Sequence, residues 1–136
     1  MTHRWMPVVA AALHRPDGRW LMHRRPPGKQ HAGLWEFPGG KVEPDEIPVK
    51  SLVRELAEEL GIRCLPEDCA PAGFAESEGG EGSAALVILL YTVGDWEGEP
   101  QALEGGAVGW FTPDEVLALP KPPLDIVLAD RLLQNR

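Results

Sequence analysis

Residues 39–62 read GGKVEPDEIPVKSLVRELAEELGI, and the second half of this stretch has the spacing of an amphipathic helix. At 100° per residue, with Glu55 placed at 0°, Glu58 falls at about −60° and Glu59 at about +40°. An apolar stripe lies beside these carboxylates, at about 60° to 160°, and consists of Val49, Leu52, Val53, Leu56 and Leu60. The pattern predicts a helix with an apolar face on a core and an acidic face next to it.

The ends of this helix are marked by residues that restrict the backbone. Pro48 is favourable in the first turn of a helix and unfavourable later, so we expect the helix to begin at about Ile47 or Pro48. Gly61 follows the last apolar position and is expected to end the helix in the left-handed conformation.

The acidic face of this helix has two interpretations. Like charges three and four residues apart repel each other, so Glu55, Glu58 and Glu59 lower the stability of the helix. Convergent carboxylates are also the ligands that hard divalent cations such as Mg²⁺ or Mn²⁺ require. A solvated helix face is the more common explanation of such a run, so the surrounding residues decide between the two.

The residues around the helix follow a fixed spacing. Gly40 is followed by five residues and Glu46, then by seven residues and Arg54-Glu55-Leu56, and then by Glu58-Glu59 and Gly61-Ile62, each after one further residue. This spacing matches the Nudix box at every specified position and places the box at residues 40–62. Residues 34–43, LWEFPGGKVE, resemble the MutT-like branch of that family, which contains 8-oxo-dGTP diphosphatases and CTP pyrophosphohydrolases.

The resemblance implies an α/β fold, the α/β/α sandwich with a mixed β-sheet, as one domain over residues 1–136. It also implies metal-dependent hydrolysis of nucleoside triphosphates, including oxidised ones such as 8-oxo-dGTP, to the monophosphate and pyrophosphate. One alternative is a pyrophosphohydrolase for CTP or other pyrimidine nucleotides. Another is a non-catalytic nucleotide-binding module, although family members that lose catalysis usually lose glutamates of the box, and all of these are present here.

The same resemblance implies the metal ligands. The carbonyl of Gly39 and the carboxylates of Glu55, Glu58 and Glu59 correspond to ligands of Mg²⁺, with Mn²⁺ as an alternative ion. Glu104 follows the segment WEGEP and corresponds to a glutamate that assists the metal site in MutT-like enzymes. The alternative for Glu104 is a mobile surface carboxylate.

Two catalytic roles follow from this metal site. Glu55 is our choice of general base, with Glu104 as the second candidate. Arg54 is expected to orient Glu55 by a charge-assisted hydrogen bond.

Two neighbouring arginines are candidates for binding the phosphates of the substrate. MutT-like sequences place a phosphate-binding arginine where Arg24 and Arg25 end a predicted strand. Because side chains alternate along a strand, only one of them can face the site, and we favour Arg24. Both could also be solvated charges at a sheet edge. Lys29 and His31, on the following loop, are interpreted as ordinary surface residues.

The final helix carries the candidate for base recognition. MutT-like enzymes place an asparagine at its start against oxidised guanine, and in this chain Pro123 takes that place with Asp125 two residues on. An ionised aspartate only accepts hydrogen bonds, so it suits a base edge with N–H groups. The alternative is that Asp125 lies in the first turn only because the helix dipole favours a negative charge there.

The remaining elements follow from apolar runs and turn residues. Residues 8–14 and 20–25 are predicted to form a hairpin around the turn at 15–19, and short strands are predicted at 35–37, 72–75 and 108–111. Residues 84–93 are expected to be the central strand, after an acidic loop at 76–83. Helices are predicted at 113–119, opened by a capping box, and at 124–133.

Composition limits the partners of the chain. The formal net charge of −8 argues against a polymeric nucleic acid and favours a small nucleotide carried with its metal ion. The residues contain no signal-peptide pattern and no apolar run of membrane-spanning length, so we expect a cytoplasmic location and no membrane contact. Cys64 and Cys69 are interpreted as free thiols, and no obligate protein partner is evident.

Overall fold

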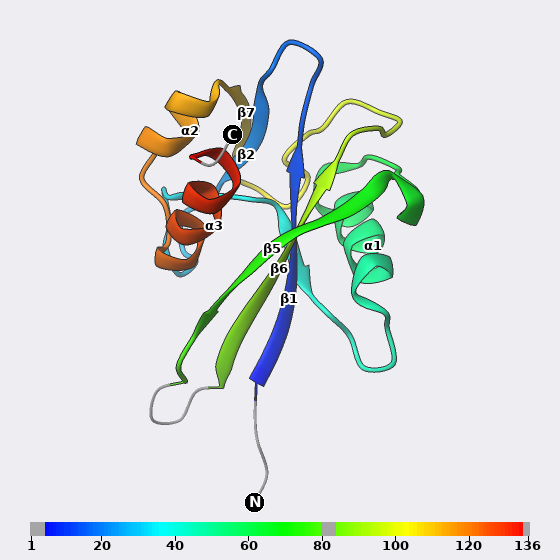
Figure 1. The fold of residues 1–136 in the computed structure, drawn as a ribbon, viewed down its shortest axis with the longest axis vertical. Coiled ribbons are helices and arrows are strands. Elements are labelled where there is room, and N and C mark those ends of the chain that lie inside the picture. Colours follow the sequence, from blue (N-terminus) through cyan, green and yellow to red (C-terminus); the bar gives the residue numbers. More distant parts are fainter. Residues whose placement is uncertain (1–4, 80–83, 135–136) are drawn as a thin grey trace, which may run out of the picture.

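The computed structural model describes residues 5–79 and 84–134 of the chain (Figure 1). In chain order the secondary-structure elements are β1 (Trp5–Leu13), β2 (Trp20–Arg24), β3 (Trp35–Glu36), β4 (Gly39–Lys41), α1 (Pro48–Leu60), the 3₁₀ turn η1 (Pro66–Asp68), β5 (Cys69–Ser77), β6 (Ala85–Val93), β7 (Ala107–Phe111), α2 (Pro113–Ala118) and α3 (Pro123–Leu133). No helix in these two ranges is long and apolar enough to cross a membrane.

The strands form two sheets with helices on both sides. The larger sheet has the order β4-β1-β6-β5, and within it β1 and β6 run parallel while the other pairs are antiparallel. The smaller sheet has the order β3-β2-β7 and is antiparallel. Figure 1 shows α1 on one side of the larger sheet and α2 and α3 on the other. The predicted α/β/α architecture with a mixed sheet is confirmed.

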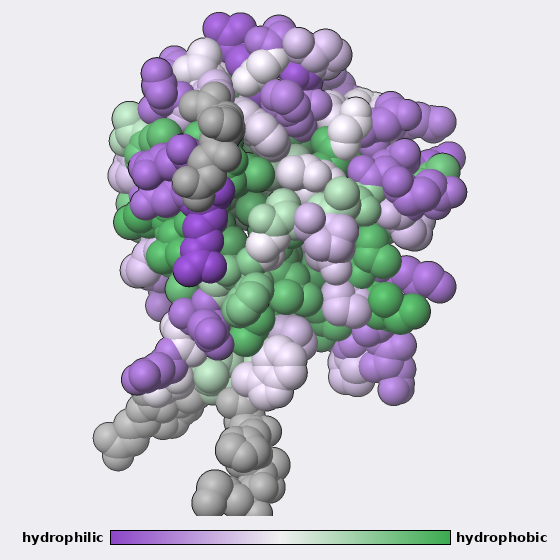
Figure 2. All heavy atoms as spheres, viewed as in Figure 1, coloured by the Kyte–Doolittle hydropathy of each residue, from purple (hydrophilic) through white to green (hydrophobic). Residues whose placement is uncertain are grey.

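Strand β1 supplies both cores of the molecule because its side chains alternate between two buried faces. Val9, Ala11 and Leu13 belong to the core under α1, whereas Ala10 and Ala12 belong to the core under α3. Hydrophilic residues cover the end of the molecule at which β1 leads into β2, and hydrophobic residues show in the middle of the same face (Figure 2).

The predicted hairpin of β1 with β2 is wrong. β1 pairs with β6 along its whole length on one edge and with β4 at residues 8–10 on the other, and β2 is not one of its ladder partners. Only an isolated bridge between His14 and Trp20 joins the two strands, and β2 continues into the smaller sheet between β3 and β7. The short apolar run was correctly assigned as a strand, but a strand buried on both faces can also have both edges occupied.

The strand predicted at residues 72–75 is longer in the structure. β5 spans Cys69–Ser77 because it pairs with nearly the whole of β6, with an irregularity between Pro71 and Gly73. The first two residues of the predicted acidic loop, Glu76 and Ser77, therefore belong to β5, while residues 80–83 lie outside the described residues. β6 itself lies between β1 and β5, as the prediction of a central strand requires.

Helix α1 has the predicted boundaries and the predicted buried face. Pro48 occupies its first turn, and Gly61 ends it with a φ of 71°. Its buried residues are Ser51, Leu52, Leu56, Glu59 and Leu60. The backbone carbonyls of the last turn also hold a distant loop, since Gln101 N donates to Leu60 O and Leu103 N donates to Glu59 O, both at 3.0 Å. Thus α1 fixes its own carboxylates and the loop that precedes β7.

Helix α3 is held against the chain that precedes β4. Asp125, in the first turn of α3, accepts a hydrogen bond from the backbone amide of Phe37 at 3.0 Å. Lys121, just before α3, is buried and donates to three carbonyls at the end of α2, those of Val116, Leu117 and Leu119. These contacts satisfy buried polar groups on both sides of the α2–α3 connection.

Candidate functional site

The three candidate carboxylates of α1 differ in their exposure to solvent. The side chain of Glu59 is 8% exposed and that of Glu55 is 17% exposed, whereas Glu58 is 52% exposed. Burial penalises the ionised form, and it raises the pKa of Glu59 to about 7. Burial also raises the pKa of Glu55, although the hydrogen bond from Arg54 opposes the change.

Arg54 connects α1 to the loop that precedes it. Its Nε lies 2.8 Å from Oε2 of Glu46, and its Nη1 lies 2.8 Å from Oε1 of Glu55 and 3.3 Å from Oε2 of Glu58. Its Nη2 donates to the carbonyl of Lys41 in β4. The arginine holds the pKa of Glu46 at about 2, chiefly through the hydrogen bond between them. This geometry is the one required of a residue that orients Glu55.

Strand β4 approaches the acidic face of α1 closely at its two glycines. The amide of Gly39 donates to Oε2 of Glu59 at 3.2 Å. A Cβ atom on Gly40 would collide with the carboxylate of Glu55, and one on Gly39 would collide with the carbonyl of Val9 in β1. Gly40 therefore lets β4 approach the carboxylates of α1, and Gly39 lets β4 pack against β1.

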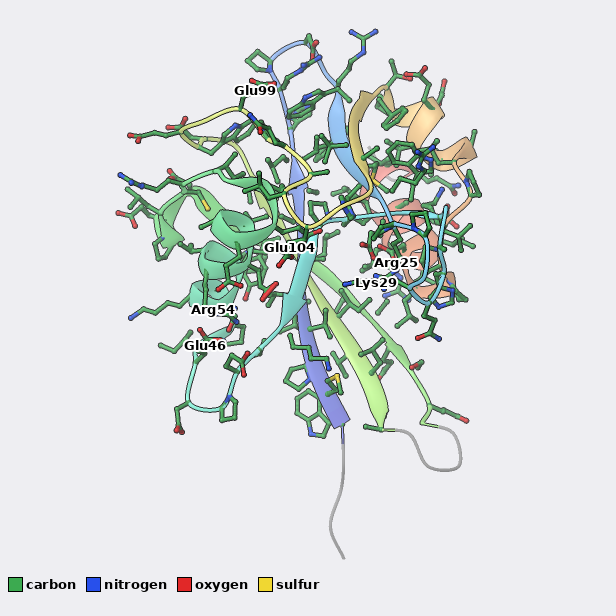
Figure 3. All side chains as sticks on the ribbon, turned by 180° about the vertical axis from the view of Figure 1, so that it is seen from behind. Arg25, Lys29, Glu46, Arg54, Glu99 and Glu104 are labelled. Carbon is green, nitrogen blue, oxygen red and sulfur yellow. The ribbon has the colours of Figure 1, made fainter. Side chains whose placement is uncertain are left out.

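A small pocket of about 130 Å³ opens beside this contact. It brings together residues from β2, the following loop, β3, β4, α1 and the loop before β7, and its lining consists of His23, Arg25, Pro26, Lys29, Glu36, Gly39, Glu59 and Glu104. Figure 3 shows Arg25 and Lys29 to one side of Glu104, and Arg54 and Glu46 to the other. Cationic side chains thus face carboxylates across the same opening.

The structure places Arg25, rather than the favoured Arg24, in this pocket. The Nη1 atom of Arg25 lies 2.8 Å from Oε1 of Glu36, and its Nε donates to the carbonyl of Gln30 at 2.6 Å. The guanidinium of Arg24 instead lies over the ring of Trp35, at 5.8 Å from the centroid. Alternation correctly predicted that only one of the two arginines faces the site, but it does not say which one, and the preference for Arg24 is not met by the pocket.

Three charged or titratable lining residues, His23, Lys29 and Glu36, were missed by sequence reasoning. Lys29 was interpreted as a surface residue, yet the loop after β2 turns it into the pocket beside Arg25. His23 was not considered, although its side chain is only 6% exposed and lies 3.2 Å from Glu36 and 3.5 Å from Glu59. The signal for His23 was its place two residues before Arg25, which directly follows β2, since residues two apart on extended backbone point to the same face.

The electrostatic environment of His23 is set by opposing effects. Burial by itself lowers the pKa of the imidazole, but the hydrogen bonds to Glu36 and to the carbonyl of Gly105, together with the charge of Glu59, give a net rise in its pKa. The charge of His23 in turn lowers the pKa of Glu59, against the larger effect of burial.

The donor atoms around the pocket suit a hard divalent cation. Glu55 lies against Gly40, Glu59 accepts from the amide of Gly39, and the exposed Glu58 lies on the same helix, so carboxylate oxygens gather beside the backbone of β4. Glu104 raises the pKa of both Glu55 and Glu59, so its charge is within reach of theirs. Within residues 5–79 and 84–134, the one group of three potential ligands with atoms within 4.8 Å of each other is His23, Glu36 and Glu59. The predicted ligands Glu55, Glu58 and Glu59 do not meet this spacing, so their oxygens do not already form a coordination shell.

Asp125 lies outside the lining of the pocket. It is 6% exposed, and burial raises its pKa to about 7 against the opposing hydrogen bond from the amide of Phe37. Since Glu36 lines the pocket and Phe37 follows it, Asp125 is connected to the pocket through the backbone of two successive residues.

Comparisons with known proteins agree with this arrangement. The model of the NUDIX domain matches residues 4–132. The CTP pyrophosphohydrolase of Escherichia coli (strain K12) is 42% identical over 130 residues, which cover 95% of this chain and 92% of that protein. An 8-oxo-dGTP diphosphatase of Haemophilus influenzae is 31% identical over 135 residues, covering 99% and 96%.

A solved structure extends the likeness to three dimensions. The crystal structure of a MutT NUDIX hydrolase from Burkholderia pseudomallei superposes with a TM-score of 0.83 at 27% identity, covering 96% of this chain and 99% of that one. Members of this family use divalent metal ions. The glycine-lined acidic face of α1, the domain match and these relatives together show that the chain belongs to the Nudix family and is a pyrophosphohydrolase of that family.

Proposed function

We propose that this chain hydrolyses nucleoside triphosphates to the monophosphate and pyrophosphate, as a single domain over residues 1–136. The observation that carries the proposal is the pocket in which Arg25 and Lys29 lie opposite Glu59 and Glu104. Arginine and lysine bind phosphate oxygens, and carboxylates bind the divalent cation that accompanies a triphosphate. The charged lining of this pocket suits the phosphates of a small nucleotide, and the acidic chain repels a polymeric nucleic acid.

The proposed cofactor is Mg²⁺, with Mn²⁺ as a substitute, held by Glu55, Glu58, Glu59, Glu104 and the carbonyl of Gly39. When bound, the ion neutralises phosphate oxygens and activates water. The protein contributes orientation. Arg54 fixes Glu55 from one side, and the amide of Gly39 fixes one oxygen of Glu59. Arg25 and Lys29 bind the phosphates and thereby fix the position of the triphosphate in the site.

Glu55 is the proposed general base. Its pKa is raised by burial, which makes the carboxylate a better proton acceptor, while Arg54 keeps it ionised and aimed at the space beside Gly40. Glu104 is the second candidate, because it lines the pocket from the opposite loop.

We infer that the preferred bases carry N–H groups on the edge that meets Asp125. One oxygen of this carboxylate accepts from the amide of Phe37, and a carboxylate has further lone pairs that can accept from a donor on the base. The amine of cytosine and the N7–H of oxidised guanine both provide a donor, so CTP, dCTP and 8-oxo-dGTP are the proposed substrates. The sequence similarity to a CTP pyrophosphohydrolase favours the cytosine nucleotides as substrates. The similarity to an 8-oxo-dGTP diphosphatase supports oxidised dGTP as a further substrate.

Pyrophosphate release tests the proposal directly. We expect release from CTP, dCTP and 8-oxo-dGTP with Mg²⁺ or Mn²⁺, and none with excess chelator.

Glu58→Gln and Glu59→Gln should each lower kcat by several orders of magnitude without loss of the fold, because neutralisation also relieves the repulsion on α1. Binding of these nucleotides without any turnover would instead support a non-catalytic module.

Gly40→Ala is expected to displace Glu55 without unfolding the protein. The added Cβ meets the flexible carboxylate of Glu55 rather than the backbone, so the side chain must move away from its position. A shift of this size is expected to lower kcat about 100-fold. Gly94→Ala is the matched control, because nothing lies within 4 Å of its Cβ position. Equal rates in the two variants, at equal melting temperatures, would remove Glu55 from the catalytic assignment.

Arg25→Ala is expected to weaken triphosphate binding far more than Arg24→Ala. Arg25 lines the pocket, whereas Arg24 lies over Trp35 outside it. Loss of a charge-assisted hydrogen bond raises KM by roughly 10- to 100-fold, and Arg25→Lys should recover part of the loss because lysine lacks the planar fork. The measurement is KM for one nucleotide across the three variants. A larger effect of Arg24→Ala would restore the assignment made from the sequence.

Asp125→Asn is expected to reduce the discrimination between CTP and UTP. The asparagine can still accept from the amide of Phe37, but it then presents an NH₂ group to the base. Uracil has an acceptor where cytosine has its amine, so kcat/KM should fall for CTP, by roughly 10- to 100-fold, and not for UTP. An unchanged ratio of kcat/KM for the two nucleotides would exclude Asp125 from base recognition.

A further inference from the structure

His23 is a buried polar residue to which the proposed reaction assigns no role. It lies on β2 with 5% of its surface exposed, at the base of the pocket. Both ring nitrogens are next to oxygen atoms. Nδ1 is 3.2 Å from Oε2 of Glu36 and 3.5 Å from Oε1 of Glu59, and Nε2 is 3.0 Å from the carbonyl oxygen of Gly105.

The direction of one of these hydrogen bonds is fixed by its partner. A backbone carbonyl can only accept, so Nε2 must donate to Gly105. This holds whether Nδ1 also carries a proton or receives one from a carboxyl group. The contact therefore joins β2 to the residue that directly follows Glu104.

The loop that carries Glu104 is held at two places. At one end, the amides of Gln101 and Leu103 donate to the carbonyls of Leu60 and Glu59 in the last turn of α1. At the other end, the loop lies directly on the end of β2, where a Cβ atom on Gly106 would collide with the carbonyl of Arg24. Among the hydrogen bonds between described residues, the one that His23 donates to Gly105 is the side-chain hydrogen bond that holds this second end of the loop.

We propose that His23 is a positioning residue that holds Glu104 opposite the carboxylates of α1. Its Nε2 fixes the loop through Gly105, and its Nδ1 fixes Glu36, which in turn holds Arg25. One imidazole thus ties the metal-binding side of the pocket to its phosphate-binding side. The inference rests on the proposed function, since it takes Glu104 as a ligand.

The two ring nitrogens can be separated by substitution. The amide nitrogen of glutamine lies one bond further from the backbone than that of asparagine, so it takes the place of Nε2, whereas that of asparagine takes the place of Nδ1. His23→Gln is therefore expected to keep the contact with Gly105, and His23→Asn to lose it. His14→Gln is the matched control, because His14 stacks on Trp20 and does not line the pocket.

Three measurements test the role of His23. In His23→Asn, kcat should fall roughly 10- to 100-fold with little change in KM, and the affinity of the free enzyme for Mn²⁺ should fall by a similar factor. Amide hydrogen exchange over residues 101–106 should become faster in that variant while the global melting temperature stays close to that of wild type. His23→Gln should keep kcat, the Mn²⁺ affinity and the slow exchange of the loop near those of wild type, but its KM should rise because it lacks the contact of Nδ1 with Glu36. His14→Gln should remain near the wild type throughout.

The proposal is overturned if His23→Asn retains the Mn²⁺ affinity and the slow exchange of the loop, or if His23→Gln loses as much as His23→Asn. A general loss of packing would instead lower the melting temperatures of both His23→Asn and His23→Gln, and that result distinguishes it from the loss of one hydrogen bond. A wild type that releases no pyrophosphate from any nucleotide would contradict the proposed function instead. The exchange measurement needs no turnover, so it tests the contact with Gly105 separately.

Discussion

The close approach of β4 to the acidic face of α1 is the constraint on which the site depends. Gly39 donates to Glu59, and Gly40 leaves the space that the carboxylate of Glu55 occupies. The apolar stripe of the same helix is buried in one core, so the helix cannot rotate to bring its acids into water without exposing that core. Hydrophobic packing therefore holds like charges together at a place where, on their own, they would separate.

The burial of these charges requires compensation, and the structure supplies it from two directions. Arg54 neutralises Glu55 and Glu46 at the solvent side of α1, and His23 lies between Glu36 and Glu59 on the inner side. The compensation is incomplete, since the pKa of Glu59 still rises to about 7. An incompletely neutralised group of carboxylates is a favourable site for a cation, because a bound ion relieves the remaining cost of burial.

The parts of the molecule that depend on local sequence were predicted, and those that depend on distant contacts were not. The boundaries of α1, its buried stripe and the ion pair of Arg54 with Glu55 all lie within a few turns of one helix. The hairpin of β1 with β2 was wrong because β2 pairs along its whole length with β7, which comes much later in the chain. His23 was missed for a similar reason, since Gly105 is 82 residues away, and no local pattern marks such a pair.

The short segment from Trp35 to Phe37 has a consequence for how such a protein diverges. The side chain of Glu36 contacts Arg25, while the next backbone amide binds Asp125 at the start of α3. In the proposed function the reaction centre is built on α1 and β4, and the group proposed for base recognition comes from a helix near the other end of the chain. On that proposal, substitutions in the first turn of α3 would alter which nucleotide is accepted and leave the acidic helix unchanged. On that proposal, one fold can act on several nucleotides, because the residues that select the base can change while the residues that carry out hydrolysis stay the same.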